Sequence, residues 1–147
     1  MKKLFCFITV LLFVFCLVGC TQNKDEHVDL EVEMMNLEIG NYSFEIELEN
    51  NVAVKALVEL LPIDIKMQEL NGNEKYYYLD ERLIETPQSI GQIKAGDIML
   101  WGNNCLVIFY KSFSTSYSYT RIGHITDITN LQSALGTGAV QVKWSVK

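Results

Sequence analysis

The chain has few of the side chains from which metal sites and disulfide frameworks are built. Its 147 residues include only 2 histidines and 4 cysteines, and two of those cysteines, Cys6 and Cys16, fall inside an apolar N-terminal run. Structural zinc sites use four Cys or His ligands, and small disulfide-stapled domains need paired cysteines. The sequence therefore predicts no metal, no cofactor and no disulfide, and Cys105 is expected to be a small, buried apolar residue in a strand.

Positive charge is also scarce. The chain has 12 Lys and Arg residues against 18 Asp and Glu residues, which gives a formal net charge of −6 at pH 7. Because residues 1–19 carry two lysines and no acidic residue, removal of that segment would lower the net charge to −8. Proteins that bind DNA or RNA present basic surfaces to the phosphate backbone. The charge therefore excludes a nucleic-acid partner.

The N-terminus has the parts of an export signal. Lys2 and Lys3 precede an apolar stretch at residues 4–18, which is shorter than the roughly 17 to 25 residues of a membrane-spanning helix. It ends in Leu-Val-Gly-Cys at residues 17–20, which resembles the lipobox of bacterial lipoproteins, whose cysteine sulfur receives a diacylglyceryl group. The resemblance implies a signal peptide at residues 1–19, a lipid on Cys20 and an extracytoplasmic protein anchored to a bacterial cell membrane. An ordinary signal peptide or an uncleaved anchor are the alternatives.

Residues 20–36 are predicted to tether the folded domain to that lipid. Their first part is polar and cannot bury enough apolar surface to fold alone. Residues 28–37 alternate more regularly and are predicted to be either more tether or a first edge strand, with Leu30, Val32 and Met34 on one face. The compact domain is expected at residues 37–147.

The domain is predicted to be mainly β. Residues 42–49 alternate between apolar and polar side chains, as in a strand with one buried face. Asn50 and Asn51 can cap a short amphipathic helix that ends at Pro62. Seven or eight short strands with one or two short helices indicate a small closed or nearly closed β-barrel. Further strands are expected over residues 63–68, 76–79, 98–101, 105–110, 119–126 and 140–146, a second helix over 131–135, and connections without strands over 85–95 and 111–118.

Four blocks of sequence resemble the bacterial cyclophilin-like domain family. They are Leu-Leu-Pro at residues 60–62, Asn-Gly-Asn-Glu-Lys-Tyr at 71–76, Ala-Gly-Asp at 95–97, and residues 106–123. The resemblance spans about residues 37–147 and implies a small cyclophilin-type barrel with helices at its ends. True cyclophilins isomerise Xaa-Pro bonds with an arginine in a Phe-His-Arg context, and this tripeptide does not occur in the sequence. Arg121 is the candidate catalytic residue, as a donor to the proline nitrogen.

Aromatic and hydroxyl side chains alternate from residue 109 to residue 121 and form the predicted ligand-binding segment. Rigid rings give contact area at low entropic cost, and hydroxyl groups give adaptable hydrogen bonds. The same rings could instead be core, and the serines a solvated loop. The ligand-binding candidates are Trp101, Phe109, Phe113, Tyr117, Tyr119, Arg121 and His124.

These features favour a membrane-tethered binding module that takes a peptide or a small ligand outside the cytoplasm. One alternative is an enzyme. It would be a divergent peptidyl-prolyl isomerase, or a hydrolase assembled from His124, a serine of residues 112–118 and a carboxylate, although no nucleophile motif supports the hydrolase. Another alternative is a structural envelope protein that contacts other proteins through an exposed sheet edge. Glu74, Asp80 and Glu81 are expected to lie on a solvated face.

Overall fold

The computed structural model describes residues 29–147, which form nine strands and two short helices. The export signal, Cys20 and most of the predicted tether lie outside the described residues. Within the described part, no helix has the length and apolar character needed to cross a membrane. The elements are β1 (Met34–Ile39), β2 (Tyr42–Leu48), α1 (Val52–Glu59), β3 (Ile63–Leu70), β4 (Glu74–Tyr78), β5 (Gln88–Ile93), β6 (Asp97–Trp101), β7 (Cys105–Phe109), β8 (Phe113–Ile125), α2 (Leu131–Leu135) and β9 (Val140–Val146).

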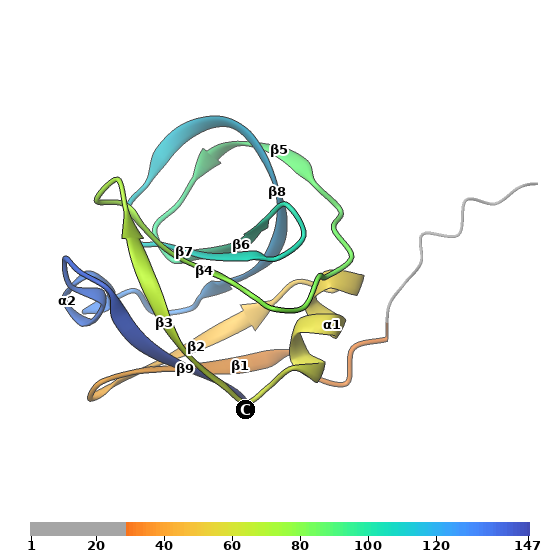
Figure 1. Cartoon of the computed structure of the whole chain (residues 1–147), viewed down its shortest axis with the longest axis horizontal. Coiled ribbons are helices and arrows are strands. Elements are labelled where there is room, and N and C mark those ends of the chain that lie inside the picture. Colours follow the sequence, from red (N-terminus) through yellow and green to blue (C-terminus); the bar gives the residue numbers. More distant parts are fainter. Residues whose placement is uncertain (1–28) are drawn as a thin grey trace, which may run out of the picture.

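Eight of the strands close into a barrel, which confirms the predicted fold class. The strands pair antiparallel in the order β2-β1-β9-β3-β4-β7-β6-β8. A pairing of β2 with β8, in which Ile46 lies opposite Ile125, closes the ring (Figure 1). Closure leaves no unpaired edge along these segments of the barrel wall.

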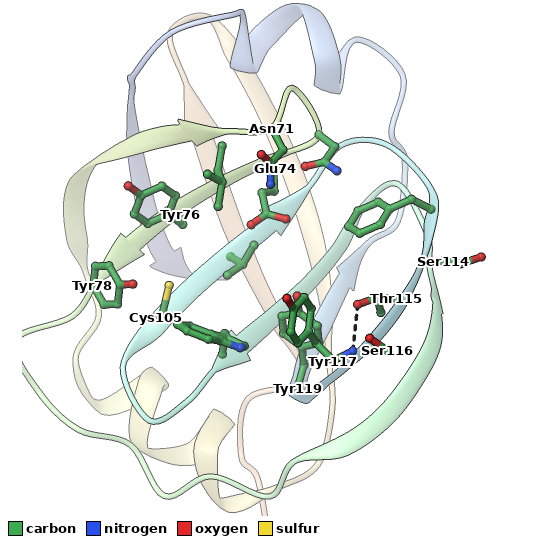
Figure 2. A pocket seen from close by; sticks show the side chains of 15 residues that line it. Asn71, Glu74, Tyr76, Tyr78, Cys105, Ser114, Thr115, Ser116, Tyr117 and Tyr119 are labelled. Atoms are coloured by element: carbon green, nitrogen blue, oxygen red, sulfur yellow. Dashed lines mark hydrogen bonds between the residues drawn. The ribbon is translucent and has the colours of Figure 1, made fainter.

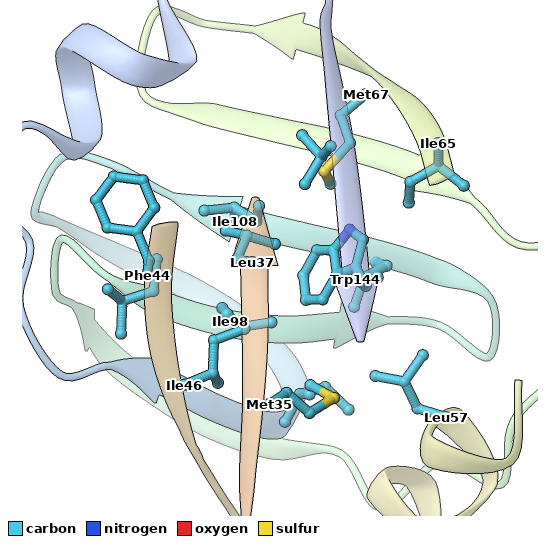
Figure 3. Packing of buried hydrophobic residues seen from close by; sticks show 14 of the residues in the cluster. Met35, Leu37, Phe44, Ile46, Leu57, Ile65, Met67, Ile98, Ile108 and Trp144 are labelled. Carbon is cyan, nitrogen blue, oxygen red and sulfur yellow. The ribbon is translucent and has the colours of Figure 1, made fainter. Parts of the chain in front are cut away.

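The side chains on the inward face of each barrel strand fill the barrel interior. Trp144, Met35 and Leu37 are fully buried there, together with Ile98 and Ile108 of the opposite wall (Figure 3). Helix α1 and helix α2 add Leu57, Leu131 and Leu135 to the same core.

The predicted helix cap is confirmed at Asn51. Its side-chain oxygen accepts a hydrogen bond from the Val54 amide at 3.0 Å, which satisfies a free donor of the first turn of α1. The same side chain donates through Nδ2 to the Arg121 carbonyl at 2.8 Å. One asparagine therefore both begins the helix and fastens it to β8.

The predictions at the start of the domain need a correction. Strand β1 lies inside the sheet, between β2 and β9, rather than at an edge. Its buried side chains are Met35, Leu37 and Ile39, so Met34 belongs to the opposite face. The alternation is short and interrupted by acidic residues, and β9, which covers the second edge of β1, comes from the far end of the chain. The local pattern alone therefore did not identify the buried face.

Two segments predicted to be connections are strands. Residues 88–93 form β5, and residues 113–118 are the first half of the 13-residue strand β8. The two segments pair with each other, with Ile93 opposite Phe113 and Gln88 opposite Tyr119. Both are rich in Gln, Ser and Thr and bury few side chains, so their sequences carry no clear period-2 signal. They are strands because their backbones form hydrogen bonds with each other, although the two segments are far apart in the sequence.

Strand β8 changes partners halfway along its length. Its first half pairs with β5, and its second half pairs with β6 on one side and β2 on the other. The β5–β8 ribbon therefore leaves the barrel wall and arches over the outer face of β6 and β7 (Figure 1). Under the arch lies a second, smaller hydrophobic core formed by Ile93, Met99, Cys105, Val107, Phe109 and Tyr119.

A buried lysine links β4 to the loop between α2 and β9. Lys75 is fully buried and donates to the Glu69 carboxylate, to the Gly136 carbonyl at 3.0 Å and to the Gly138 carbonyl at 2.6 Å. The Tyr110 hydroxyl donates to the other Glu69 oxygen at 2.8 Å. All three ammonium protons have an acceptor, as a buried charge requires.

Candidate functional site

The outer face of the barrel and the β5–β8 ribbon enclose a cavity of about 530 Å³. This volume lies in the range of small-molecule sites, roughly 300 to 1,000 Å³. Strands β4 and β7 form one side, the first half of β8 forms the other, and Trp101 lies at the end of β6 (Figure 2). The lining residues that the following argument uses are Asn73, Glu74, Tyr76, Tyr78, Trp101, Cys105, Phe113, Tyr117 and Tyr119.

The aromatic rings around the cavity are held by one another. Phe109 is fully buried beneath the cavity, and its ring packs edge-on against Phe113 and Tyr119 with centroids 5.6 Å apart in both pairs. Tyr76 and Tyr78 share the outward face of β4 and pack edge-on at 5.8 Å. Such edge-to-face pairs stabilise aromatic clusters beyond simple burial. The rings therefore form two preorganised walls, one on β4 and one on the ribbon.

Two further rings are exposed at the rim of the cavity. The side chains of Trp101 and Tyr117 are 47% and 64% exposed, although both line the cavity. Exposed aromatic rings beside a concave surface are a feature of binding sites.

Glu74 is the one charged side chain among the lining residues. Its carboxylate is directed into the cavity (Figure 2), and within the described part of the chain it forms no ion pair and no hydrogen bond. Burial, followed by the nearby charge of Glu69 on β3, raises the pKa of Glu74 above its usual value. Lys75 does not neutralise it, because alternation along β4 places the lysine on the opposite face of the sheet.

Burial disfavours the thiolate form of the cavity cysteine. Burial raises the pKa of Cys105 to about 11. A hydrogen bond with Tyr78 lowers this pKa, and the charge of Glu74 raises it. The thiolate, which is the nucleophilic form, is therefore a minor species at neutral pH. Cys105 is 4% exposed and packs with Val107 and Phe109, in the apolar role expected from the sequence.

The structure divides the predicted ligand-binding residues between two places. Trp101, Phe113, Tyr117 and Tyr119 line the aromatic cavity, and Phe109 supports it from below.

Arg121 and His124 line a different, polar cavity of about 320 Å³ at the other half of β8. The His124 Nε2 atom lies 3.5 Å from a Glu47 carboxylate oxygen. The structure therefore does not bring the candidate isomerase donor, Arg121, to the aromatic rings. Of the serines at residues 112–118 that were predicted to act with His124, Ser114 and Ser116 line the aromatic cavity and not the cavity that His124 lines.

Sequence analysis missed the contribution of β4. Glu74, assigned there to a solvated face, lines the cavity together with Tyr76 and Tyr78. The period-2 spacing of these three residues places them on one face, and this signal could have grouped them. The pairing of β4 with β7, which places that face opposite the ribbon, was needed to identify the face as a wall of a site.

Among residues 29–147 no group of three or more His, Cys, Asp or Glu side chains is arranged to hold a metal ion. Aromatic faces and edges, hydroxyl groups and one carboxylate surround an open space.

Comparison with curated proteins gives no match. Among solved structures, the chain is similar to a hypothetical protein from Archaeoglobus fulgidus whose solution structure is known. The two are 17% identical, with a TM-score of 0.49, over 79% of this chain and 96% of the other. The model of the cyclophilin-like family matches residues 37–145, which include the strands that close the barrel and those that enclose the cavity. The chain therefore belongs to the cyclophilin-like family, as the four sequence blocks suggested.

Proposed function

We propose that the protein is a lipid-anchored, extracytoplasmic binding module that takes a peptide or a small ligand in the aromatic cavity. The observation that carries the proposal is the cavity itself, enclosed by the ribbon and the barrel wall and lined by aromatic rings from β4, β6 and β8. A closed barrel is a rigid support, and sites on rigid supports bind with little reorganisation. The exposed rings of Trp101 and Tyr117 contribute little to the barrel core, which supports a role in binding.

Removal of either rim ring is expected to weaken binding without unfolding the protein. In the Trp101→Ala and Tyr117→Ala variants, we expect each substitution to weaken ligand binding by about tenfold, since Trp and Tyr side chains often carry a large share of the binding energy. The measurement is protein-observed NMR during titration with a library of short peptides and small organic fragments. Ligands should shift the resonances of residues that line the cavity in the wild type.

Tyr42→Ala is the matched control, because Tyr42 is 41% exposed on β2 and lies outside the residues that line the cavity. Its binding should equal that of the wild type. Ligands that shift resonances elsewhere on the barrel, or that bind both rim variants as well as the wild type, would contradict the proposed site.

The proposed anchor rests on the lipobox-like ending at Cys20. Cys20→Ala is expected to abolish lipid attachment, because that sulfur is the acceptor, and two acyl chains are needed for stable membrane attachment. The measurement is incorporation of labelled palmitate in a bacterium that expresses the protein. Cys16→Ala, which changes a cysteine within the apolar stretch, should keep the label. Label that persists in Cys20→Ala, or no label in the wild type, would refute the anchor.

A further inference from the structure

The aromatic cavity holds a negative charge that the fold does not compensate. Glu74 begins β4, lies opposite Phe109 of β7 and is partly buried. No Lys, Arg or His is among the residues that line the cavity. The nearest lysine in sequence, Lys75, is fully occupied by Glu69, Gly136 and Gly138 on the other face of the sheet. A partly desolvated carboxylate without a counter-charge costs stability.

The electrostatic influence of Glu74 extends across the cavity. Burial is the largest cause that raises the pKa of Tyr119 on the ribbon, and the charge of Glu74 is the second. The charge of Glu74 also raises the pKa of Cys105 on β7. Burial is the main reason that both groups are disfavoured as anions, and the negative potential of Glu74 adds to it. The same potential attracts a cation and repels an anion.

Beside Glu74, the cavity wall has a second acceptor without a donor. In the described structure the side-chain oxygen of Asn73 is buried and accepts no hydrogen bond, and Asn73 lines the cavity. A buried carbonyl without a hydrogen-bond partner costs stability. Two neighbouring acceptors therefore lack N–H donors at one end of the cavity.

The rest of the cavity suits an alkyl chain that ends in a cation. The rings of Tyr76, Tyr78 and Tyr117 line the space beyond the carboxylate (Figure 2). Aromatic faces attract ammonium groups within about 6 Å and pack against methylene groups. Six of the fifteen lining residues are aromatic, and Glu74 is the one charged residue among the fifteen.

We propose that the cavity binds a primary ammonium group at the end of an alkyl chain, with Glu74 and Asn73 accepting its hydrogen bonds and the aromatic rings enclosing the chain. This inference rests on the proposed binding function. A lysine side chain of a peptide and a free alkylamine share this chemistry. A quaternary ammonium lacks the N–H groups that the two acceptors need, and an anionic ligand would meet the charge of Glu74.

The test is calorimetric titration of the purified protein with the N-acetylated and C-amidated peptide Gly-Lys-Gly, with its norleucine and trimethyllysine analogues blocked in the same way, and with n-butylamine. The wild type should bind the lysine peptide at least about tenfold more tightly than the norleucine and trimethyllysine analogues. Glu74→Gln should lose the preference over norleucine. Glu85→Gln, which changes an exposed carboxylate outside the cavity, should keep it. Comparison with n-butylamine then separates a peptide source from a free amine.

The Glu74→Gln variant should also be at least as stable as the wild type at neutral pH. A carboxyl group whose pKa is raised on folding contributes stability below its unfolded pKa, and loses that contribution as the pH rises through the folded pKa. Near pH 7 the ionised Glu74 therefore lowers the stability of the folded protein, and glutamine removes this cost. A melting temperature at or above that of the wild type would show that lost binding is not lost folding.

Three results would overturn the inference. Equal binding of the lysine and norleucine peptides would refute the cation and leave the binding cavity standing. Tighter binding of the trimethyllysine peptide would refute the role of N–H donors. Absence of binding by both n-butylamine and the lysine peptide at millimolar concentration would refute the ligand class, and the library titration of the rim variants would decide on the binding function separately.

Discussion

Replacing Lys75 with methionine is expected to lower the free energy of unfolding by about 3 to 5 kcal/mol, the usual cost of removing one partner from a buried ion pair. Methionine has a side chain of similar length but removes the ammonium that donates to the Glu69 carboxylate and to the carbonyls of Gly136 and Gly138. Among the described residues, Glu69 then keeps only its hydrogen bonds from Tyr110 and Gly72. The three acceptors of the Lys75 ammonium lie on β3 and on the loop that joins α2 to β9. The loss should therefore loosen that end of the barrel. Urea unfolding followed by tryptophan fluorescence measures it.

The effect of Lys75→Met should also depend on pH. Burial alone would raise the pKa of Glu69, but hydrogen bonds from Lys75 and Tyr110 outweigh it and hold the pKa below the usual 4.5. A carboxyl group with a lowered pKa contributes stability above its unfolded pKa and loses it as the pH falls through the folded value. The difference between wild type and variant should therefore be full at neutral pH and shrink below about pH 4.5.

Lys66→Met is the matched control, because Lys66 is an exposed lysine on the neighbouring strand β3. Surface substitutions of this kind change stability by about 0.5 kcal/mol or less. If Lys75→Met cost no more than Lys66→Met, the three acceptors would have found other donors, and the buried network could not be a main support of this end of the barrel.

Substituting Gly123 with alanine is expected to open the barrel where β2 meets β8. Gly123 lies opposite Leu48 on β2 and opposite Ile98 on β6. A Cβ atom at this position would overlap the main-chain oxygen of Glu47 and press on the side chain of Ile46. A backbone oxygen in a sheet cannot rotate away as a side chain can, so β2 would have to move off β8. We expect a loss of about 3 kcal/mol in the free energy of unfolding.

Gly138→Ala separates this steric effect from the general effect of removing a glycine. No atom lies within 4 Å of a Cβ built on Gly138, so the variant should be as stable as the wild type or slightly more stable. Hydrogen exchange of the β2 amides should rise in Gly123→Ala and not in Gly138→Ala. Unchanged protection of β2 in Gly123→Ala would contradict the proposed role of this glycine in closing the barrel.

The parts of the fold that could be predicted are those with strong local patterns. Residues 42–49 alternate over a whole strand, and Asn51 begins a helix whose apolar spacing is helical. The β5–β8 ribbon could not be predicted in this way. Its polar side chains face solvent, and its strand character comes from a ladder between residues such as Ile93 and Phe113, which are distant in the chain.

Only one wall of the candidate site could be predicted from the sequence. The hydroxyl-rich aromatic run identified the ribbon wall, with Phe113, Tyr117 and Tyr119. Arg121 and His124 belong to the same strand but line another cavity, because β8 passes from the ribbon into the barrel wall between Tyr119 and Arg121. A sequence pattern cannot show where a strand exchanges one partner for another.

The amino-acid sequence by itself determined the mainly β fold class, the helix cap and the cyclophilin-like family. Alternation and capping are properties of neighbouring residues, and the family blocks are short runs that can be compared directly as sequence. Tertiary structure alone decided that the ribbon covers β6 and β7, that Lys75 is buried with three acceptors, and that Glu74 lies uncompensated among aromatic rings. The physical reason is that the burial and charge environment of a side chain depend on the strands that pair around it, and those pairings join residues far apart in the chain.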